Sequence, residues 1–463
     1  MRTVYVSALA FVVLSAGLYF AFHDHLFPAP GAPLSQIHEK VSGSGFETFA
    51  PLLRPTEKIE RLDDVDFLLS PSEPFVPADV RTASVRLPDQ VLEAVLAGER
   101  RFFPIEIASL AVASLRARAH GAHHAKLMEV YELDGVPSPD PTGRYGYYVV
   151  ELDGEIFDVF GARKDVQVKR GRVLEDVQAV AAAGALSALA QVTRGDDVAR
   201  ALRSVRRAHE LDPKSPSIRA IEGTLWMVTG QLDEGEQEFE AALALSPDPS
   251  RKNLVAGFKL AVGELGMAAE LVGEAIAEDP ALAPAYVTRA GLELARGDLV
   301  GARASLAKAE GLDPELPALA VLFAQLDLAE NDTESAKRRI RAELARYPDD
   351  AQVHMAAVQV FHAAHDYDAM RRSVQAVLRL SPLSQRTMLE EQIRAVFGPT
   401  ALLPPTDLDE VEEDGDDESD EAPATFPVEI RLDARSPFGD EFRLKEPDFG
   451  GAKSPKGLRL LDE

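Results

Sequence analysis

Two groups of side chains in residues 84–170 are of types that can do chemistry. Asp158 lies on the second strand of a predicted hairpin, "YYVVEL" and "EIFDVF", whose strands are joined by Asp-Gly, a strong two-residue turn signal. A carboxylate on a strand can orient a catalytic histidine. His120, His123 and His124 in "HGAHH" could bind a metal, although histidines at a helix end also suit the helix dipole. With no second ligand cluster of matching spacing, we predict no metal and no cofactor.

The elements expected to position these groups are two helices followed by three strands. Pro88 and Asp89 mark the start of the first helix, and the second runs from Pro104 to near Gly121. The strands are "AKLMEVYEL", "YYVVEL" and "EIFDVF", with a Pro-rich loop at 134–144 between the first two. This pattern predicts a small α+β domain.

That order resembles the transglutaminase-like fold over about residues 100–165. In that family a Cys opens the buried helix with an Ala four residues on, and successive strands carry a His and an Asp. Ala108 and "SLRA" match the helix, so Pro104 stands in the Cys position, Tyr147 in the His position and Asp158 in the Asp position. Proline offers no nucleophile, and a phenol with a pKa near about 10 is a poor base. The resemblance therefore implies a domain that has lost its catalysis and serves packing or recognition.

Composition limits the classes of function. The chain of 463 residues is long enough for two to four units, and its net charge of −27 argues against binding nucleic acid. It contains no cysteine, which excludes disulfides and thiolate nucleophiles.

The first residues predict contact with a membrane. Val4 to Phe22 are 19 residues without a charge, enough for a helix to cross a bilayer. A cleaved signal peptide and a buried core helix are the alternatives. Arg2 precedes the segment, so the positive-inside rule places the bulk of the chain outside the cytoplasm. We predict residues 1–22 to be a single-pass anchor and the remainder to be periplasmic or extracytoplasmic.

Two further regions lack a sustained period. Residues 23–83 are rich in Pro, Gly and Ser and are predicted to form an extended stalk. Residues 407–421 hold 11 acidic residues and no basic one, within a predicted acidic, disordered tail at 398–463. An interaction tail or weak cation sink is the alternative for the acidic run. The segment after it could also dock as an extended strand.

Prolines give the clearest signal of organisation. Pro213, Pro247, Pro280, Pro314, Pro348 and Pro382 follow one another at intervals of 34, 33, 34, 34 and 34 residues. Small residues recur in register with them, at Ala201, Ala268, Ala302 and Ala336, with Gly235 and Met370 in the other two units. A repeating pair of antiparallel helices explains both features. Small residues let the two helices approach closely, and proline ends the second helix.

This pattern resembles the tetratricopeptide repeat over residues 182–384, followed by a capping helix at 385–397. The predicted fold class is thus mainly α, a solenoid of helix hairpins preceded by the small α+β domain and one membrane helix. By the resemblance, the first helix of each unit lines a concave groove that binds a peptide. Its candidate positions are Leu254, Phe258, Leu294, Gln325, Leu328, Met355, Gln359 and His362. Arg194 and Arg251 are isolated and form no carboxylate clamp, so an apolar segment or helix is the expected ligand. Packing between neighbouring repeats is the alternative for each of the eight.

These features together predict a membrane-anchored scaffold that binds other proteins in a bacterial envelope assembly and has no activity of its own. Two alternatives stay open. One is an enzyme of the transglutaminase or protease type acting through residues 84–170, and the other is a sensor that binds a ligand there.

Overall fold

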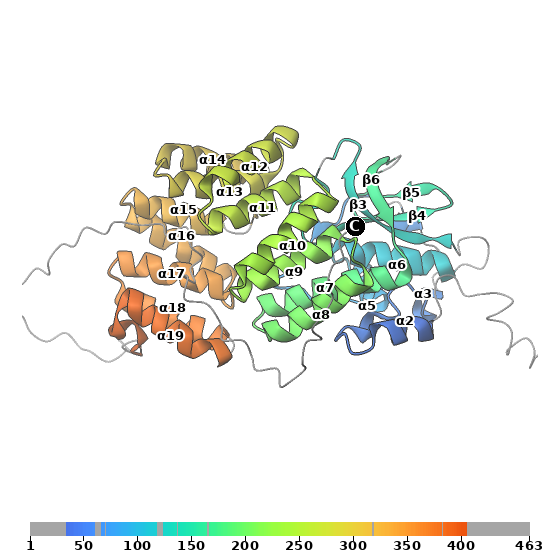
Figure 1. Cartoon of the computed structure of the whole chain (residues 1–463), viewed down its shortest axis with the longest axis horizontal. Coiled ribbons are helices and arrows are strands. Elements are labelled where there is room, and N and C mark those ends of the chain that lie inside the picture. The colour runs from blue at the N-terminus through green and yellow to red at the C-terminus, as the bar shows by residue number, and fades with distance from the viewer. Residues whose placement is uncertain are drawn as a thin grey trace, which may run out of the picture.

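The computed structural model describes residues 34–60, 66–69, 71–117, 124–136, 138–163, 166–316, 319–381 and 383–404. The molecule is elongated, with a small β-sheet at one end and an array of helices that extends to the other (Figure 1). The N-terminal helices lie at the same end as the sheet.

The sheet has four antiparallel strands in the order β5-β4-β3-β6. Its strands are β3 (Lys126–Leu133), β4 (Tyr147–Leu152), β5 (Glu155–Phe157) and β6 (Val168–Val173), and it packs on helix α6 (Pro104–Ala117), beside α5 (Pro88–Leu96). Asp153 and Gly154 both have positive φ, 52° and 88°, as the predicted tight turn requires. The third predicted strand is shorter than expected, and β6 was not predicted at all. Its sequence "VKRGRV" alternates half-buried and exposed side chains and carries three basic residues, so it shows no apolar run.

Residues 23–33, 61–65 and 70 of the predicted stalk lie outside the described residues, and the described residues of 34–83 correct that prediction. They form α2 (Leu34–Val41), η1 (Glu47–Phe49), α3 (Glu57–Glu60), α4 (Asp66–Leu69) and β1 (Val76–Pro77), which pairs in parallel with β2 (Arg101–Phe102). Val41 and Leu52 are completely buried, and the ring of Phe46 fills the space beside Gly184, where a Cβ atom would lie 2.3 Å from it. Scattered apolar residues with no regular spacing anchor this segment, so periodicity gave no sign of its packing.

The array contains six consecutive helix pairs. They are α7 (Asp176–Thr193) with α8 (Val198–Leu211), α9 (Pro216–Val228) with α10 (Leu232–Leu245), α11 (Pro249–Ala261) with α12 (Leu265–Glu278), α13 (Ala283–Ala295) with α14 (Leu299–Leu312), α15 (Leu319–Ala329) with α16 (Thr333–Arg346), and α17 (Ala351–Ala363) with α18 (Tyr367–Leu380). The predicted small residues sit at the crossings: Ala268, Ala302 and Ala336 are completely buried. At Gly235 a Cβ atom would lie 3.2 Å from the carbonyl oxygen of Gly223, so α9 and α10 meet almost backbone to backbone.

The prolines end the second helices, as predicted. Helices α8, α10, α12, α14 and α16 each end two residues before a proline of the series. The residue in between leaves the helical region in every case, with φ from −130° to −149°. Proline disfavours helical backbone at the preceding residue, which explains this common exit. Pro382 lies outside the described residues.

The C-terminal end of the array is covered by α19 (Leu383–Phe397) and the 3-10 helix η3 (Pro399–Leu402). Ala401 of η3 is completely buried, so the predicted disordered tail does not begin at residue 398. The acidic run and the predicted span at 4–22 lie outside the described residues. Among the described residues, no helix is both long and apolar enough to cross a bilayer.

Candidate functional site

Tyr147 and Asp158, which the transglutaminase-like resemblance places at the His and Asp positions, meet in the structure. The Tyr147 hydroxyl donates to Asp158 Oδ1 at 2.7 Å, and Arg163 Nη1 donates to Asp158 Oδ2 at 2.7 Å and to the Tyr147 oxygen at 3.1 Å. Asp158 also accepts from the backbone N–H of Gly161 at 2.9 Å. Burial and then the neighbouring Asp158 raise the pKa of Tyr147, so the phenol keeps its proton. The cluster joins β4 to the chain after β5 and contains no thiol.

The other residues singled out in this region have structural positions. Pro104 is the first residue of α6 and is buried. His124 is exposed, whereas His120 and His123 lie outside the described residues. The described part of "HGAHH" therefore offers a single imidazole.

Three of the eight predicted groove residues are core residues. Leu254 and Phe258 on α11 and Leu294 on α13 are 7%, 3% and 6% exposed. The rings of Phe258 and Phe239 lie 5.3 Å apart between α11 and α10. These side chains pack between helices of the array, as in the alternative interpretation, and are closed to a peptide.

The other five groove residues remain accessible. Gln325 and Leu328 lie on α15, and Met355, Gln359 and His362 lie on α17. Gln359 is exposed and the other four are half-buried. Their spacing of three or four residues puts each set on one face of its helix. The accessible face formed by these five, called here the α15–α17 face, combines apolar and uncharged polar groups.

A buried polar interface joins the sheet to the first three helix pairs. Arg172 on β6 binds Glu129 on β3 at 2.8 Å and also Asp212, the residue that ends α8. Glu129 accepts from the Ser217 hydroxyl at 2.8 Å, and Ser217 accepts in turn from Arg251 on α11 at 3.0 Å. Four of these five residues are at most 3% exposed, and the Arg172 side chain is 19% exposed. The α+β region is thereby fixed on the turns that precede α9 and α11.

A second contact reaches the far end of the array. Residues 78–83, called here the 78–83 loop, connect β1 to the region before α5, and Arg81 lies at its tip. Arg81 Nη1 donates to Asp350 Oδ2 at 3.1 Å, and its guanidinium carbon lies 3.9 Å from the centre of the Tyr347 ring. Thr193 at the end of α7 donates to the carbonyl oxygen of Val80 at 3.3 Å. The loop therefore links the first helix of the array to the start of α17.

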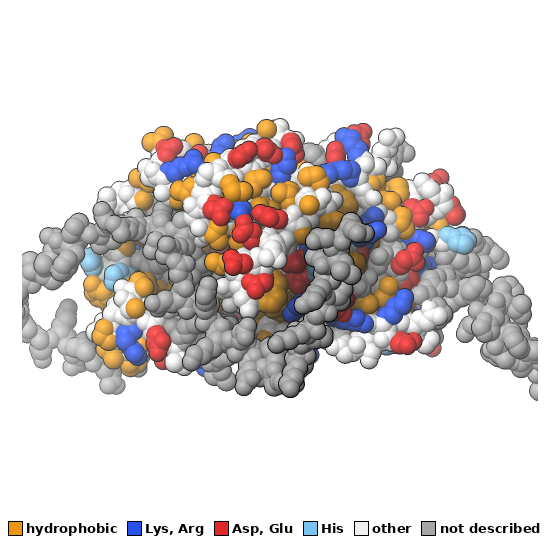
Figure 2. Space-filling view, in the orientation of Figure 1, with side chains coloured by type: hydrophobic (Ala, Val, Ile, Leu, Met, Phe, Trp, Pro, Cys, Tyr) orange, Lys and Arg blue, Asp and Glu red, His pale blue; other side chains and the backbone are white. Residues whose placement is uncertain are grey.

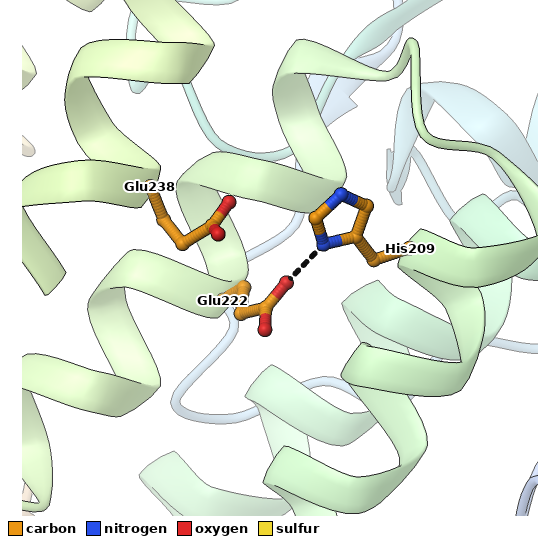
Figure 3. Close-up of side chains that lie close together, drawn as sticks. All are labelled: His209, Glu222 and Glu238. Atoms are coloured by element: carbon orange, nitrogen blue, oxygen red, sulfur yellow. Dashed lines mark hydrogen bonds and ion pairs between the residues drawn. The ribbon is translucent and has the colours of Figure 1, made fainter. Parts of the chain in front are cut away.

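One further cluster holds metal-ligating groups. His209 on α8, Glu222 on α9 and Glu238 on α10 point toward one another, with ligand atoms within 4.8 Å and a 2.6 Å hydrogen bond between His209 Nδ1 and Glu222 (Figure 3). Arg219 donates to Glu238 at 2.8 Å, and Arg206 lies 3.9 Å from Glu222. Two arginines thus balance the two carboxylates, and we assign this cluster the role of linking three helices.

Charges on the visible face are mixed, with acidic side chains gathered near its middle, where α9 and α10 lie (Figure 2). Helix α10 alone carries Asp233, Glu234, Glu236, Glu238 and Glu240. Such a surface repels phosphate backbones.

Sequence reasoning missed the residues that link the α+β region to the far end of the array. Arg81 and Asp350 are separated by 269 positions, and neither lies in a motif. Asp350 alone carried a local signal, since an Asp before a helix predicts an N-cap, and it accepts from the backbone N–H of Gln352 at 2.8 Å.

The comparisons with known proteins agree with the helical array. Residues 293–360 match the family model described as tetratricopeptide repeat. The match lies within the helical array, and the predicted tetratricopeptide repeat is confirmed. The match does not extend to residues 100–165, so the transglutaminase-like resemblance stays a prediction.

Solved structures similar to the chain include the following three, all of low identity. A tetratricopeptide repeat protein from Parabacteroides merdae is 16% identical, with 44% of this chain and 83% of that chain covered and a TM-score of 0.32. A thermophilic TPR protein of Thermus thermophilus is 19% identical, with coverages of 41% and 100% and a TM-score of 0.36. PilF of Pseudomonas aeruginosa is 19% identical, with coverages of 46% and 96% and a TM-score of 0.31. No curated protein matches the chain.

Proposed function

We propose that this protein is a membrane-anchored scaffold that binds another protein of a bacterial envelope assembly through the α15–α17 face and has no catalysis of its own. The observation that carries the proposal is that this face stays accessible while the earlier groove positions are buried. Gln359 on α17 is exposed. Met355 on the same helix and Leu328 on α15 are half-buried.

The chemistry of the α15–α17 face favours an apolar segment or an amphipathic helix as the ligand. Leu328 and Met355 offer apolar contact, and a flexible methionine adapts to different partner shapes. Gln325 and Gln359 can satisfy polar groups of a bound backbone. Arg194 and Arg251 are committed elsewhere: Arg194 donates to the carbonyl oxygen of Ala83, and Arg251 belongs to the buried polar interface. A carboxylate grip by these two side chains is thus disfavoured.

Membrane attachment and extracytoplasmic location rest on the sequence. The 19 uncharged residues at 4–22 are long enough to cross a bilayer, and Arg2 precedes them. The absence of catalysis is supported by the Tyr147–Asp158–Arg163 cluster, whose phenol and carboxylate bind each other instead of a nucleophile.

Stoichiometric co-purification of the full chain from native membranes in mild detergent tests the proposal. Met355→Glu and Gln359→Glu should abolish retention of the partner, because each places a charge against an apolar ligand. Val300→Glu is the matched control, since Val300 is 84% exposed on the second helix of its pair. Equal retention of the partner by all three variants, or no stoichiometric partner for the wild-type chain, would refute the proposal. Deleting residues 2–22 should move the protein out of the membrane fraction.

A further inference from the structure

Two polar contacts of the α+β region with the array differ in their surroundings. In the buried polar interface with the first three helix pairs, four of the five side chains are at most 3% exposed and Arg172 is 19% exposed. The contact with the last two pairs consists of ion pairs and a ring contact. The side chains of Arg81 and Asp350 are 16% and 12% exposed, and a second ion pair there, Arg101 with Glu315 at 3.5 Å, is 61% and 58% exposed. Among the described residues, the apolar core of the α+β region extends into α7–α9, whereas the core cluster of the last two pairs includes no residue of that region, so the second contact has fewer interactions to lose and is the one that can open.

The 78–83 loop is built to hold Arg81 in place. Asp79 accepts from the Arg81 backbone N–H at 2.9 Å and from its guanidinium at 2.8 Å. Ala78 donates to the carbonyl oxygen of Phe102 at 2.9 Å, which ties the base of the loop to β2. The loop therefore presents its arginine from the α+β region as a preorganised side chain.

Arg81 binds at the beginning of the helix that carries most of the proposed binding face. Asp350 is the N-cap of α17, with one carboxylate oxygen committed to the backbone N–H groups of Gln352 and Val353. Its other oxygen accepts from Arg81. Met355 of the α15–α17 face follows five residues after this cap.

A separate contact brings the two ends of the array together. At Gly195, in the turn after α7, a Cβ atom would lie 2.9 Å from the carbonyl oxygen of Leu380 at the end of α18. The first and last helix pairs are thus adjacent, with the 78–83 loop touching both. A ligand that enters between them needs the ends to separate.

We propose that the 78–83 loop is an autoinhibitory latch: Arg81, bound to Asp350 and Tyr347, holds the first and last helix pairs together, and its release lets the last two pairs move away from the first, so that a partner can approach the whole of the α15–α17 face. This inference rests on the proposed function for the identity of the regulated face. Release moves the last two helix pairs, while the buried polar interface keeps the α+β region fixed on the first three.

Hydrogen exchange on the full-length protein in mild detergent tests the latch without any partner. Arg81→Ala and Asp350→Asn, which keeps the N-cap oxygen, should both raise deuterium uptake at residues 193–198 and 346–353 and leave residues 212–217 unchanged. Arg341→Ala is the matched control. Arg341 also donates to an N-cap aspartate, Asp366 of α18, at 2.8 Å, and it contacts Asp366 and the Phe361 ring instead of the 78–83 loop. Unchanged uptake at both segments in both variants, or the same increase at these segments in Arg341→Ala, would overturn the latch.

Partner capture by the same variants tests the regulation. The apparent affinity equals the intrinsic affinity multiplied by the fraction of molecules in the open state. Arg81→Ala and Asp350→Asn raise that fraction, so the amount of captured partner should increase severalfold, up to about tenfold. Increased exchange with unchanged capture would overturn the regulatory role. A third outcome is that exchange increases in the variants but neither they nor the wild type capture a stoichiometric partner. The contact between Arg81 and Asp350 is then supported, whereas the proposed function and the regulatory inference both fail.

Discussion

Arg172 offers the sharpest test of how the α+β region is held on the array. Its guanidinium donates to Glu129 Oε2 at 2.8 and 3.0 Å and to Asp212 Oδ1 at 2.8 Å. Both carboxylates are at most 1% exposed as side chains. In Arg172→Met two buried negative charges lose their counter-charge, and removing one partner of a buried ion pair costs about 3–5 kcal/mol.

Urea-induced unfolding measures the global stability of each variant. A separate hydrogen-exchange measurement at residues 212–217 reports loss of docking without global unfolding. Lys169→Met on the same strand is the control. The Lys169 side chain is 51% exposed, pairs with Glu132 and Asp134 at 3.6 and 3.3 Å, and should contribute less than about 1 kcal/mol. If Arg172→Met lowers the free energy of unfolding no more than Lys169→Met does, the view that buried charge fixes this interface is refuted.

The pH dependence of the same variant follows from Asp212. Burial raises the pKa of Asp212 above its ordinary value, and Arg172 opposes that rise. Removing the arginine raises this pKa further, so the folded variant takes up a proton at a pH where the unfolded chain stays ionised. The stability gap between wild type and Arg172→Met should therefore narrow as pH falls from 7 toward about 4.5. A gap that stays constant over this range would contradict the reasoning.

Three further outcomes are expected. Gly235→Val should destabilise the second helix pair by about 1–3 kcal/mol in thermal unfolding, because its side chain meets the Gly223 carbonyl, whereas Gly273→Val, with open space around its Cβ, should cost much less. Burial, and secondarily His365, lowers the pKa of His362, so its folded form stays neutral where the unfolded form is charged. Acidification below about 6.5 should thus weaken α17–α19 packing in wild type and less so in His362→Asn, by hydrogen exchange. Tyr147→Phe should lower stability by about 1 kcal/mol and Asp158→Ala by more, since the latter leaves the Tyr147 hydroxyl and the Gly161 N–H without their acceptor and Arg163 without its ion-pair partner.

Each of these outcomes has a result that would contradict it. Equal melting temperatures for the two glycine variants would mean that α9 and α10 are not closely packed at Gly235. A pH response in His362→Asn as large as in wild type would assign the effect to another group. Greater loss in Tyr147→Phe than in Asp158→Ala would show that the phenol, and not the carboxylate, holds that cluster.

The repeat was predictable because its physics is local. A proline excludes helical backbone at the residue before it, and a small side chain at a helix crossing acts on the adjacent helix of the same pair. Both effects span fewer residues than one unit, so Pro213 to Pro348 predicted the ends of five helices. The buried groove positions were a different matter. The rotation of α11 about its axis decides whether Phe258 faces a bound ligand or packs on Phe239. Packing of α11 on the preceding helix pair sets that rotation.

The sequence by itself determined the helical repeat and the Asp-Gly hairpin, because each depends on backbone preferences contained in a few neighbouring residues. Tertiary structure alone decided that residues 34–83 are part of the core and that the array closes on the 78–83 loop. Phe46 beside Gly184 and Arg81 beside Asp350 meet only after the whole chain has folded. Single apolar or charged residues are common on any surface, and only burial and a partner distinguish these.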